Sequence, residues 1–223
     1  MHIPDGFLNT PTIAATYTVS VSGLAIVWQK VKKQFDQQTV PKIAMLAAFI
    51  FVAQMINIPV TGGTSGHLLG GFLAALVVGP SAGIFIIALV LVVQMLLFQD
   101  GGITALGANI LNMGITGVGI SYLLFYHLER INRKFFHSRL FQSFSVFLAA
   151  WISVEVSAIL CGTELGFSGL ADMKVSIGLL AGVHAVIGLL EGIMTLFIYE
   201  SIRSIRPDMI LSLESPVKEA AEK

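Results

Sequence analysis

The sequence is poor in charged residues and in cysteine. Charged residues make up 12% of the 223 positions and apolar residues make up 55%, whereas about a quarter of an ordinary soluble domain is charged. With a mean hydropathy of +0.84, the chain has more apolar surface than a soluble domain could bury, which indicates a membrane protein. A net charge of zero gives no reason to expect nucleic acid as a partner. The single Cys161 can form no internal disulfide, so cysteine usage does not indicate whether the protein's compartment is oxidising or reducing.

Motifs of membrane-bound catalysis are also missing. The chain has no H-E-x-x-H pair and no nucleophile beside a base. A channel or a transporter that works alone would be indicated by a strong internal repeat, and we find none. The alternative function that stays open is a membrane-embedded metal-dependent enzyme that uses His67, His184 and Glu191.

Apolar stretches separated by turn or charged residues predict an all-α, polytopic membrane protein of about seven transmembrane helices. Since one span needs about 20 apolar residues, the chain forms a single integral membrane domain, 1–223, with no room for a soluble one. The third stretch is short and rich in glycine, so a re-entrant or tilted segment competes with a full span there. The stretches run over 10–28, 43–58, 68–80, 82–99, 104–127, 141–161 and 175–199.

Basic residues predict the orientation, because Lys and Arg near the ends of spans stay in the cytoplasm. With seven spans, twelve of the thirteen basic residues fall on one side and only Lys174 falls on the other. The N-terminus is then outside and the C-terminus inside, in the cell (inner) membrane. The twelve residues are Lys30, Lys32, Lys33, Lys42, Arg130, Arg133, Lys134, Arg139, Arg203, Arg206, Lys218 and Lys223.

The first residues, Met1-His2-Ile3-Pro4-Asp5-Gly6-Phe7-Leu8, have the chemistry of a chelator. The Met1 amine and the His2 amide nitrogen close a five-membered ring on a metal, and the amide nitrogen and His2 Nδ1 close a six-membered ring. A fourth nitrogen would complete a planar set that suits Ni(II) or Cu(II) better than Zn(II) or Mg(II). Pro4-Asp5-Gly6 is turn chemistry that could fold this segment back onto the membrane domain.

The predicted outer face supplies His67 as the fourth ligand, at the end of a glycine-rich loop that also holds Ser65. His184 and Glu191 lie seven residues apart and share one face of the last span, where ionisable groups normally point into the bundle. A structural polar network is the preferred interpretation of this pair, and a second metal or proton site is the alternative. Together with Ser65 and Asn109, they are candidates to orient the ligands.

The N-terminal octapeptide strongly resembles the CbiM/NikM family, the substrate-binding (S) components of energy-coupling-factor (ECF) transporters for cobalt and nickel. Supporting motifs are Gly66-His67-Leu68-Leu69-Gly70, the segment 107–114, and His184 with Gly188 and Glu191. The resemblance implies that Met1, His2 and His67 hold the metal. It also implies an extracellular chelating segment (1–9), an added first helix (10–29), a six-helix S-component core (42–200) and a cytoplasmic tail (201–223).

The resemblance implies partners as well. No G-x-x-x-x-G-K-[ST] loop is present, so ATP must be hydrolysed elsewhere; the family supplies a pair of ATPase subunits, a transmembrane coupling (T) protein and often a small additional membrane subunit. Family members dock the coupling protein through an Ala-x-x-x-Ala pattern, which Ala44 and Ala48 fit. Ni(II) or Co(II) is expected as transported substrate, with no cofactor and no enzymatic activity. The planar nitrogen set favours nickel without deciding between the two metals.

Overall fold

The structure, a computed structural model, describes residues 1–37, 39–56, 58–60 and 64–210. Within them the chain is helical, as expected, apart from one hairpin between α2 and α3 in which Ile58 pairs with Gly66. The elements are α1 (Thr10–Val31), α2 (Thr39–Gln54), β1 (Ile58–Val60), β2 (Thr64–Gly66), α3 (Gly71–Val78), α4 (Pro80–Phe98), α5 (Leu106–Asn109), the π-helix η1 (Ile110–Thr116), α6 (Gly117–Ile131), the π-helix η2 (Asn132–Phe136), α7 (Arg139–Phe167), α8 (Met173–Ile205) and the 3₁₀ turn η3 (Pro207–Met209).

Five helical segments are long and apolar enough to cross a membrane, counted over the described residues. They are α1, α4, the continuous run from α5 to η2, α7 and α8, and each contains or closely overlaps one of the predicted stretches. A sixth, α2, is apolar but only 16 residues long. Long helices with apolar exteriors make this chain a multi-pass membrane protein.

The expected third transmembrane helix has a different form. In its place α3 has eight residues, about 12 Å of helix, which is too short for a hydrocarbon core of about 30 Å. Gly70 has φ +69° before α3, Gly79 has φ +87° after it, and Pro80 starts α4. These residues break the helix at both ends, so the competing idea of a re-entrant or tilted segment describes this stretch better.

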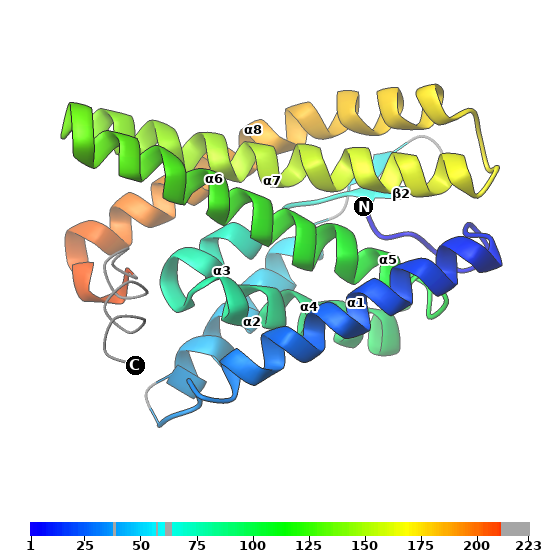
Figure 1. Ribbon diagram of the computed structural model, residues 1–223, viewed down its shortest axis with the longest axis horizontal. Helices are drawn as coiled ribbons and strands as arrows, with labels where there is room; N and C mark the ends of the chain where they lie inside the picture. The colour runs from blue at the N-terminus through cyan, green and yellow to red at the C-terminus, as the bar shows by residue number, and fades with distance from the viewer. Residues whose placement is uncertain (38, 57, 61–63, 211–223) are drawn as a thin grey trace.

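Burial in protein compensates for the short helix. All eight residues of α3 are buried, and α3 lies in the middle of the bundle between α2, α4 and α6 (Figure 1). Glu191 of α8 accepts hydrogen bonds from the backbone N–H groups of Leu69 (2.9 Å) and Gly70 (2.8 Å). Non-helical backbone at this depth is tolerated only where protein supplies such partners.

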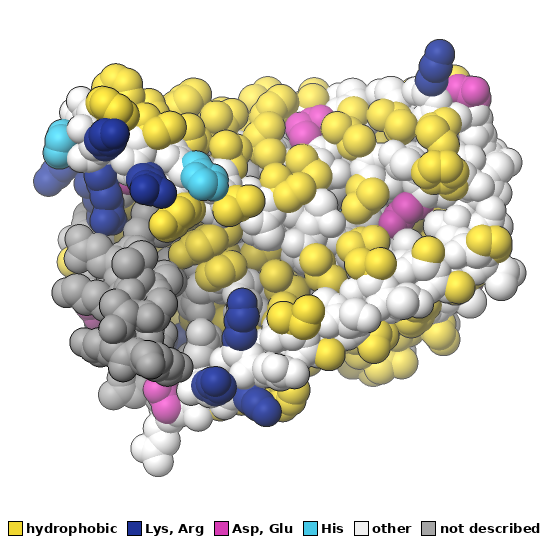
Figure 2. All heavy atoms as spheres, in the orientation of Figure 1, with side chains coloured by type: hydrophobic (Ala, Val, Ile, Leu, Met, Phe, Trp, Pro, Cys, Tyr) yellow, Lys and Arg dark blue, Asp and Glu magenta, His cyan; other side chains and the backbone are white. Residues whose placement is uncertain are grey.

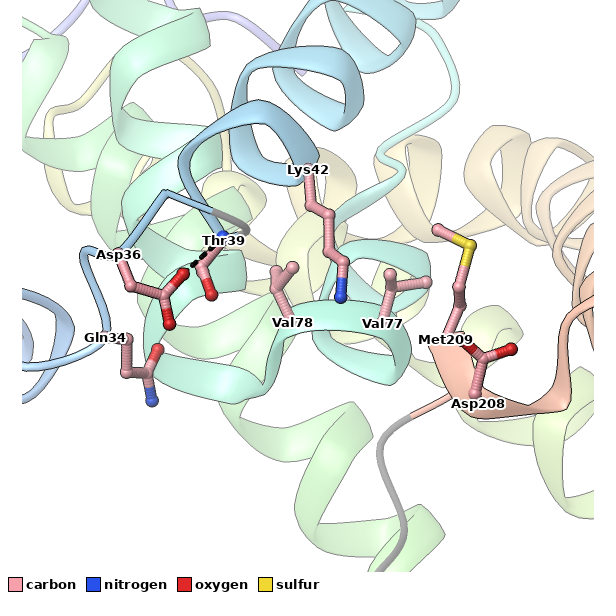
Figure 3. Close-up of a pocket in the computed structure, with 8 residues that line it drawn as sticks. All are labelled: Gln34, Asp36, Thr39, Lys42, Val77, Val78, Asp208 and Met209. Atoms are coloured by element: carbon pink, nitrogen blue, oxygen red, sulfur yellow. Dashed lines mark hydrogen bonds between the residues drawn. The ribbon is translucent and has the colours of Figure 1, made fainter.

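The two ends of the bundle differ in charge. Lys and Arg side chains gather at the end where the C-terminal part of α8 lies, and are sparse at the opposite end (Figure 2). A pocket of about 320 Å³ at the basic end joins the α1–α2 connection, the last turn of α3 and η3. In Figure 3, Lys42 reaches over Val77 and Val78 of α3, with Asp36 and Asp208 on either side. The last turn of α3 therefore lies beside the start of α2, at the basic end of the bundle.

Candidate metal site

The N-terminal segment is folded into the bundle at the end away from the basic residues. Met1 and Ile3 have no exposed surface, and His2 is 3% exposed. Leu8 is also buried, and Asn9 caps α1 by accepting a hydrogen bond from the Thr12 N–H (3.0 Å). The predicted return of the terminus onto the membrane domain is what the structure contains.

Asn109 and Gly102 fix the backbone directly after His2. The Ile3 N–H donates to Asn109 Oδ1 (2.9 Å), and Asn109 Nδ2 donates back to the Ile3 carbonyl (3.2 Å). The Gly102 N–H donates to the same carbonyl (2.9 Å). A Cβ on Gly102 would collide with Asp5, so glycine is required for this close approach. Asn109, a predicted orienting residue, therefore positions the neighbour of His2 and not the ring.

Asp5 ties the terminal turn to the loop after α4. Its carboxylate accepts hydrogen bonds from the Ile103 N–H (3.1 Å), the Thr104 N–H (2.7 Å) and Thr104 Oγ1 (2.5 Å). The bonds from Thr104 hold the pKa of Asp5 below its usual value. The Pro-Asp-Gly sequence predicted a turn, and the structure adds that the Asp side chain anchors that turn.

The two predicted histidine ligands meet inside the bundle. The His2 and His67 rings lie 4.5 Å apart between centroids, tilted by 44°. His67 Nδ1 lies 2.8 Å from the Leu68 carbonyl, so this nitrogen carries the proton and Nε2 keeps its lone pair. Among the described residues, Nε2 of His67 is buried and has no hydrogen-bond partner. Such a buried acceptor is costly unless it meets a partner such as a metal ion.

The Met1 amine is prepared to act as a ligand. Burial lowers its pKa from 8.0 to about 5, against the smaller opposing effects of Cys161 and Asp100. Burial also lowers the pKa of His2, while the contact with Asp100 opposes the shift. At neutral pH the amine is therefore uncharged and can donate its electron pair to a metal.

Asp100, which belongs to none of the sequence motifs, contacts His2. Its Oδ1 lies 2.6 Å from His2 Nδ1, the nitrogen expected to close the six-membered ring. Nδ1 cannot donate to Asp100 and bind a metal at the same time, so chelation by Nδ1 requires this contact to break. An acidic residue placed immediately after an apolar stretch that ends outside was the signal that could have identified Asp100.

Glu191 and Gln54 form hydrogen bonds with the backbone of the segment that follows His67. Besides the two bonds to Glu191, the Leu69 carbonyl accepts a hydrogen bond from Gln54 Nε2 (2.7 Å). Both oxygens of Glu191 are thus occupied by backbone N–H groups. The preferred interpretation of Glu191 as part of a structural network agrees with this geometry.

The other predicted residues lie at varying distances from the site. His184 is buried on α8, and its Nδ1 lies 2.8 Å from the Leu180 carbonyl. Ser65 lies in β2, and its side chain is outside the described part of the structure. Ala44 and Ala48 are both exposed on α2, away from the ligands.

A metal cluster made of side chains alone is not found in the described ranges: no three His, Cys, Asp or Glu residues come together there. The enzyme alternative needs His67, His184 and Glu191 around one metal, and the carboxylate of Glu191 is instead bonded to the chain at Leu69 and Gly70. A site that includes the terminal amine is the arrangement for which the buried groups are suited.

Comparisons with known proteins all find proteins that transport transition metals. The model of the CbiM family, described as the cobalt uptake substrate-specific transmembrane region, matches residues 2–209. A predicted fused nickel transport protein, NikMN, of Archaeoglobus fulgidus is 39% identical over 98% of this chain and 70% of its own length. A cobalt transport protein, CbiM, of Acetoanaerobium sticklandii is 29% identical over 89% of this chain and 83% of its own. A crystal structure of a truncated transition metal transporter superposes with a TM-score of 0.83 at 31% identity, covering 92% of this chain and 99% of that one.

Proposed function

The chain belongs to the CbiM family of cobalt-uptake transmembrane proteins, and on that premise we propose that it captures Ni(II) or Co(II) for an ATP-driven uptake transporter. The metal is bound by the Met1 amine, the His2 amide nitrogen, His2 Nδ1 and one nitrogen of His67. The ion is the transported substrate and not a cofactor. Relatives are named as nickel and cobalt transport proteins, and none of those reported above is named as an enzyme.

The observation that carries this proposal is the burial of the chain terminus beside two histidine rings. Met1 has no exposed surface, and His2 and His67 are 3% and 1% exposed. Burying an amine and two rings with unpaired nitrogens is unfavourable without a ligand for them. Three different ranges, the terminus, the loop before α3 and the loop after α4, converge to make this arrangement.

The transport machine needs further subunits. The relative from Archaeoglobus fulgidus is described as a fusion, and this chain matches 70% of it. We propose that a transmembrane coupling protein, a pair of ATPases and a small additional membrane subunit complete the transporter. The N-terminal site faces outward and the basic end faces the cytoplasm, in the inner membrane, because positive charge favours that orientation.

Acetylation of the N-terminus tests the chelate. An acetylated Met1 nitrogen has no free electron pair for the five-membered ring, so the acetylated protein should lose high-affinity Ni(II) binding and keep its fold. Affinity is measured by isothermal titration of the purified full chain, and folding by thermal unfolding. His2→Ala should cause a comparable loss because it removes the six-membered ring. Native affinity in the acetylated protein would rule out the terminal chelate.

Nickel and cobalt can be distinguished by competition. A planar set of four nitrogens suits low-spin Ni(II), so we expect Ni(II) to displace Co(II) from the purified protein. Metal analysis of protein with an authentic N-terminus, equilibrated with equal amounts of both ions, measures the preference. Retention of Co(II) in excess over Ni(II) would make cobalt the substrate.

A further inference from the structure

Asp100 lies at the mouth of the candidate metal site. Its side chain is 18% exposed, whereas the His2 side chain that it contacts at 2.6 Å is 2% exposed. Gln99, with φ +55°, ends α4 in the left-handed conformation, and the Asp100 N–H donates to the Gln94 carbonyl (3.2 Å). The helix end thus holds the carboxylate between the ligands and the exterior.

The charge of the proposed complex is not balanced by its ligands. A divalent ion brings two positive charges, and the His2 amide brings one negative charge once it has lost its proton. The amine and both imidazoles are neutral when they bind, so one positive charge remains. Met1 and His67 are at most 1% exposed, and an uncompensated charge in such surroundings is expensive.

Other nearby carboxylates are held by different partners. Asp5 accepts three hydrogen bonds from Ile103 and Thr104, and Glu164 accepts one from Asn112 Nδ2 (2.7 Å). Asp100, by contrast, touches the proposed ligand His2 directly. Its single negative charge equals the charge left over by the complex.

We propose that Asp100 is the counter-charge of the bound divalent ion and makes the occupied site neutral. The inference rests on the proposed function, since it assumes the chelate of Met1 and His2. Before the metal binds, Asp100 holds the His2 ring through Nδ1. During binding the contact between Nδ1 and Asp100 breaks, the ring proton moves to Nε2, and the Nδ1 electron pair forms the bond to the metal. The amide proton is lost to water, so one proton leaves for each ion bound.

Asp100→Asn tests the charge with little change in size. Asparagine keeps an oxygen that can accept a hydrogen bond from His2, but it carries no charge. We expect Ni(II) affinity to fall by about 10- to 100-fold, the usual effect of removing a group that supports metal ligands. The absorption band of the bound Ni(II) should keep its wavelength, because Asp100 is not a ligand. Both quantities come from titrating the purified full chain, with its native N-terminus, with a nickel salt.

Two further variants make the result specific. Asp208→Asn removes the same charge from an exposed position at the other end of the bundle and should bind Ni(II) like the unaltered protein. Asp100→Glu keeps the charge and should retain more affinity than Asp100→Asn. Thermal unfolding of each variant shows whether it folds, and the comparison of Glu with Asn at one position remains informative if both lose some stability.

Different outcomes separate this inference from the function it rests on. A shifted band in Asp100→Asn would make Asp100 a ligand and overturn the counter-charge. Unchanged affinity in that variant, or equal losses in Asp100→Asn and Asp100→Glu, would also overturn it. If the unaltered protein failed to bind Ni(II), the proposed function itself would fail.

Discussion

The buried Met1 amine determines how many protons the site releases. An exposed α-amino group is largely protonated at neutral pH, with a pKa near 8, whereas here burial lowers the pKa to about 5. At about pH 7.5 only the His2 amide should therefore give up a proton when Ni(II) binds. Calorimetry in buffers of different ionisation enthalpy should count close to one proton per ion.

The sign of the pH dependence follows from the same shift. The amine takes up a proton as pH falls through about 5, and a protonated amine cannot bind a metal. Near neutral pH one proton is released on binding, so the affinity should fall in proportion to the rising proton concentration. Below about pH 5 the amine must also lose a proton, so the affinity should fall more steeply. Release of nearly two protons at about pH 7.5 would mean that the amine is exposed and charged.

His67 and His184 are expected to differ in their effect on the metal. His67 Nε2 is buried next to His2 and has no hydrogen-bond partner within the described ranges, whereas His184 Nδ1 lies beside the carbonyl of Leu180 on its own helix. His67→Ala should leave three chelating nitrogens with water in the fourth position. The weaker ligand field should lower affinity and move the yellow band of low-spin Ni(II) to longer wavelength.

His184→Ala is the matched control on α8 and should leave that band in place. Absorption spectra of the two purified variants decide the matter without a transport assay. A shift in His184→Ala together with an unchanged spectrum in His67→Ala would move the fourth ligand to α8.

At the scale of elements, Glu191 of α8 stabilises the non-helical segment around His67 through hydrogen bonds to its backbone. Glu191→Ala would leave the buried N–H groups of Leu69 and Gly70 without acceptors, at a cost of about 1–3 kcal/mol each. We expect a lower unfolding temperature and weaker Ni(II) binding, since His67 lies two residues before Leu69. Glu191→Gln keeps one acceptor oxygen and should fall between Ala and the unaltered protein, as thermal unfolding can measure.

Equal unfolding temperatures for the three proteins would show that the Glu191 contacts do not stabilise α3. Loss of metal binding in Glu191→Gln with full stability would instead assign Glu191 to the metal. The two results are distinguishable because stability and affinity are measured on the same preparations.

How far the sequence predicts these elements depends on the kind of contact. The chelate follows from covalent geometry within Met1 and His2, so it needs no knowledge of the fold. Span positions follow from apolar length, and α1, α4, α7 and α8 lie where the sequence places them. Asp100 and Asn109 act through partners 98 and 106 positions away in the chain, and a single sequence contains no signal that pairs them.

The third apolar stretch shows the same limit. Its composition favoured a span, and its glycines favoured a break, but the choice depended on whether buried partners existed for its backbone. Those partners are Glu191 and Gln54, from α8 and α2. The sequence shows which polar residues lie in the apolar stretches. It does not show which backbone groups those residues bond to.

On the scale of the whole molecule, the metal site and the proposed docking face are separate surfaces. The N-terminus lies inside the bundle, in the half away from the basic residues (Figures 1 and 2), whereas Ala44 and Ala48 are exposed on α2. Ala48 also lines an apolar groove of about 310 Å³ between α2 and α4, together with Phe51 and Leu89. Small residues let a neighbouring transmembrane helix approach closely, so this face fits a coupling protein embedded in the same bilayer.

Bulk on that face should therefore impair assembly without affecting capture of the metal. Ala44→Leu and Ala48→Leu should bind Ni(II) like the unaltered protein but co-purify with the coupling protein in reduced amount, because the added methyl groups keep the helices apart. Gly182→Leu is the matched control: Gly182 is exposed on α8, where a Cβ meets no atom within 4 Å, and it should assemble normally. If both α2 variants assembled and transported as well as Gly182→Leu, the docking face would have to lie on another helix. If they lost Ni(II) binding as well, the two surfaces would be coupled through α2, whose Gln54 already contacts the chain beside His67.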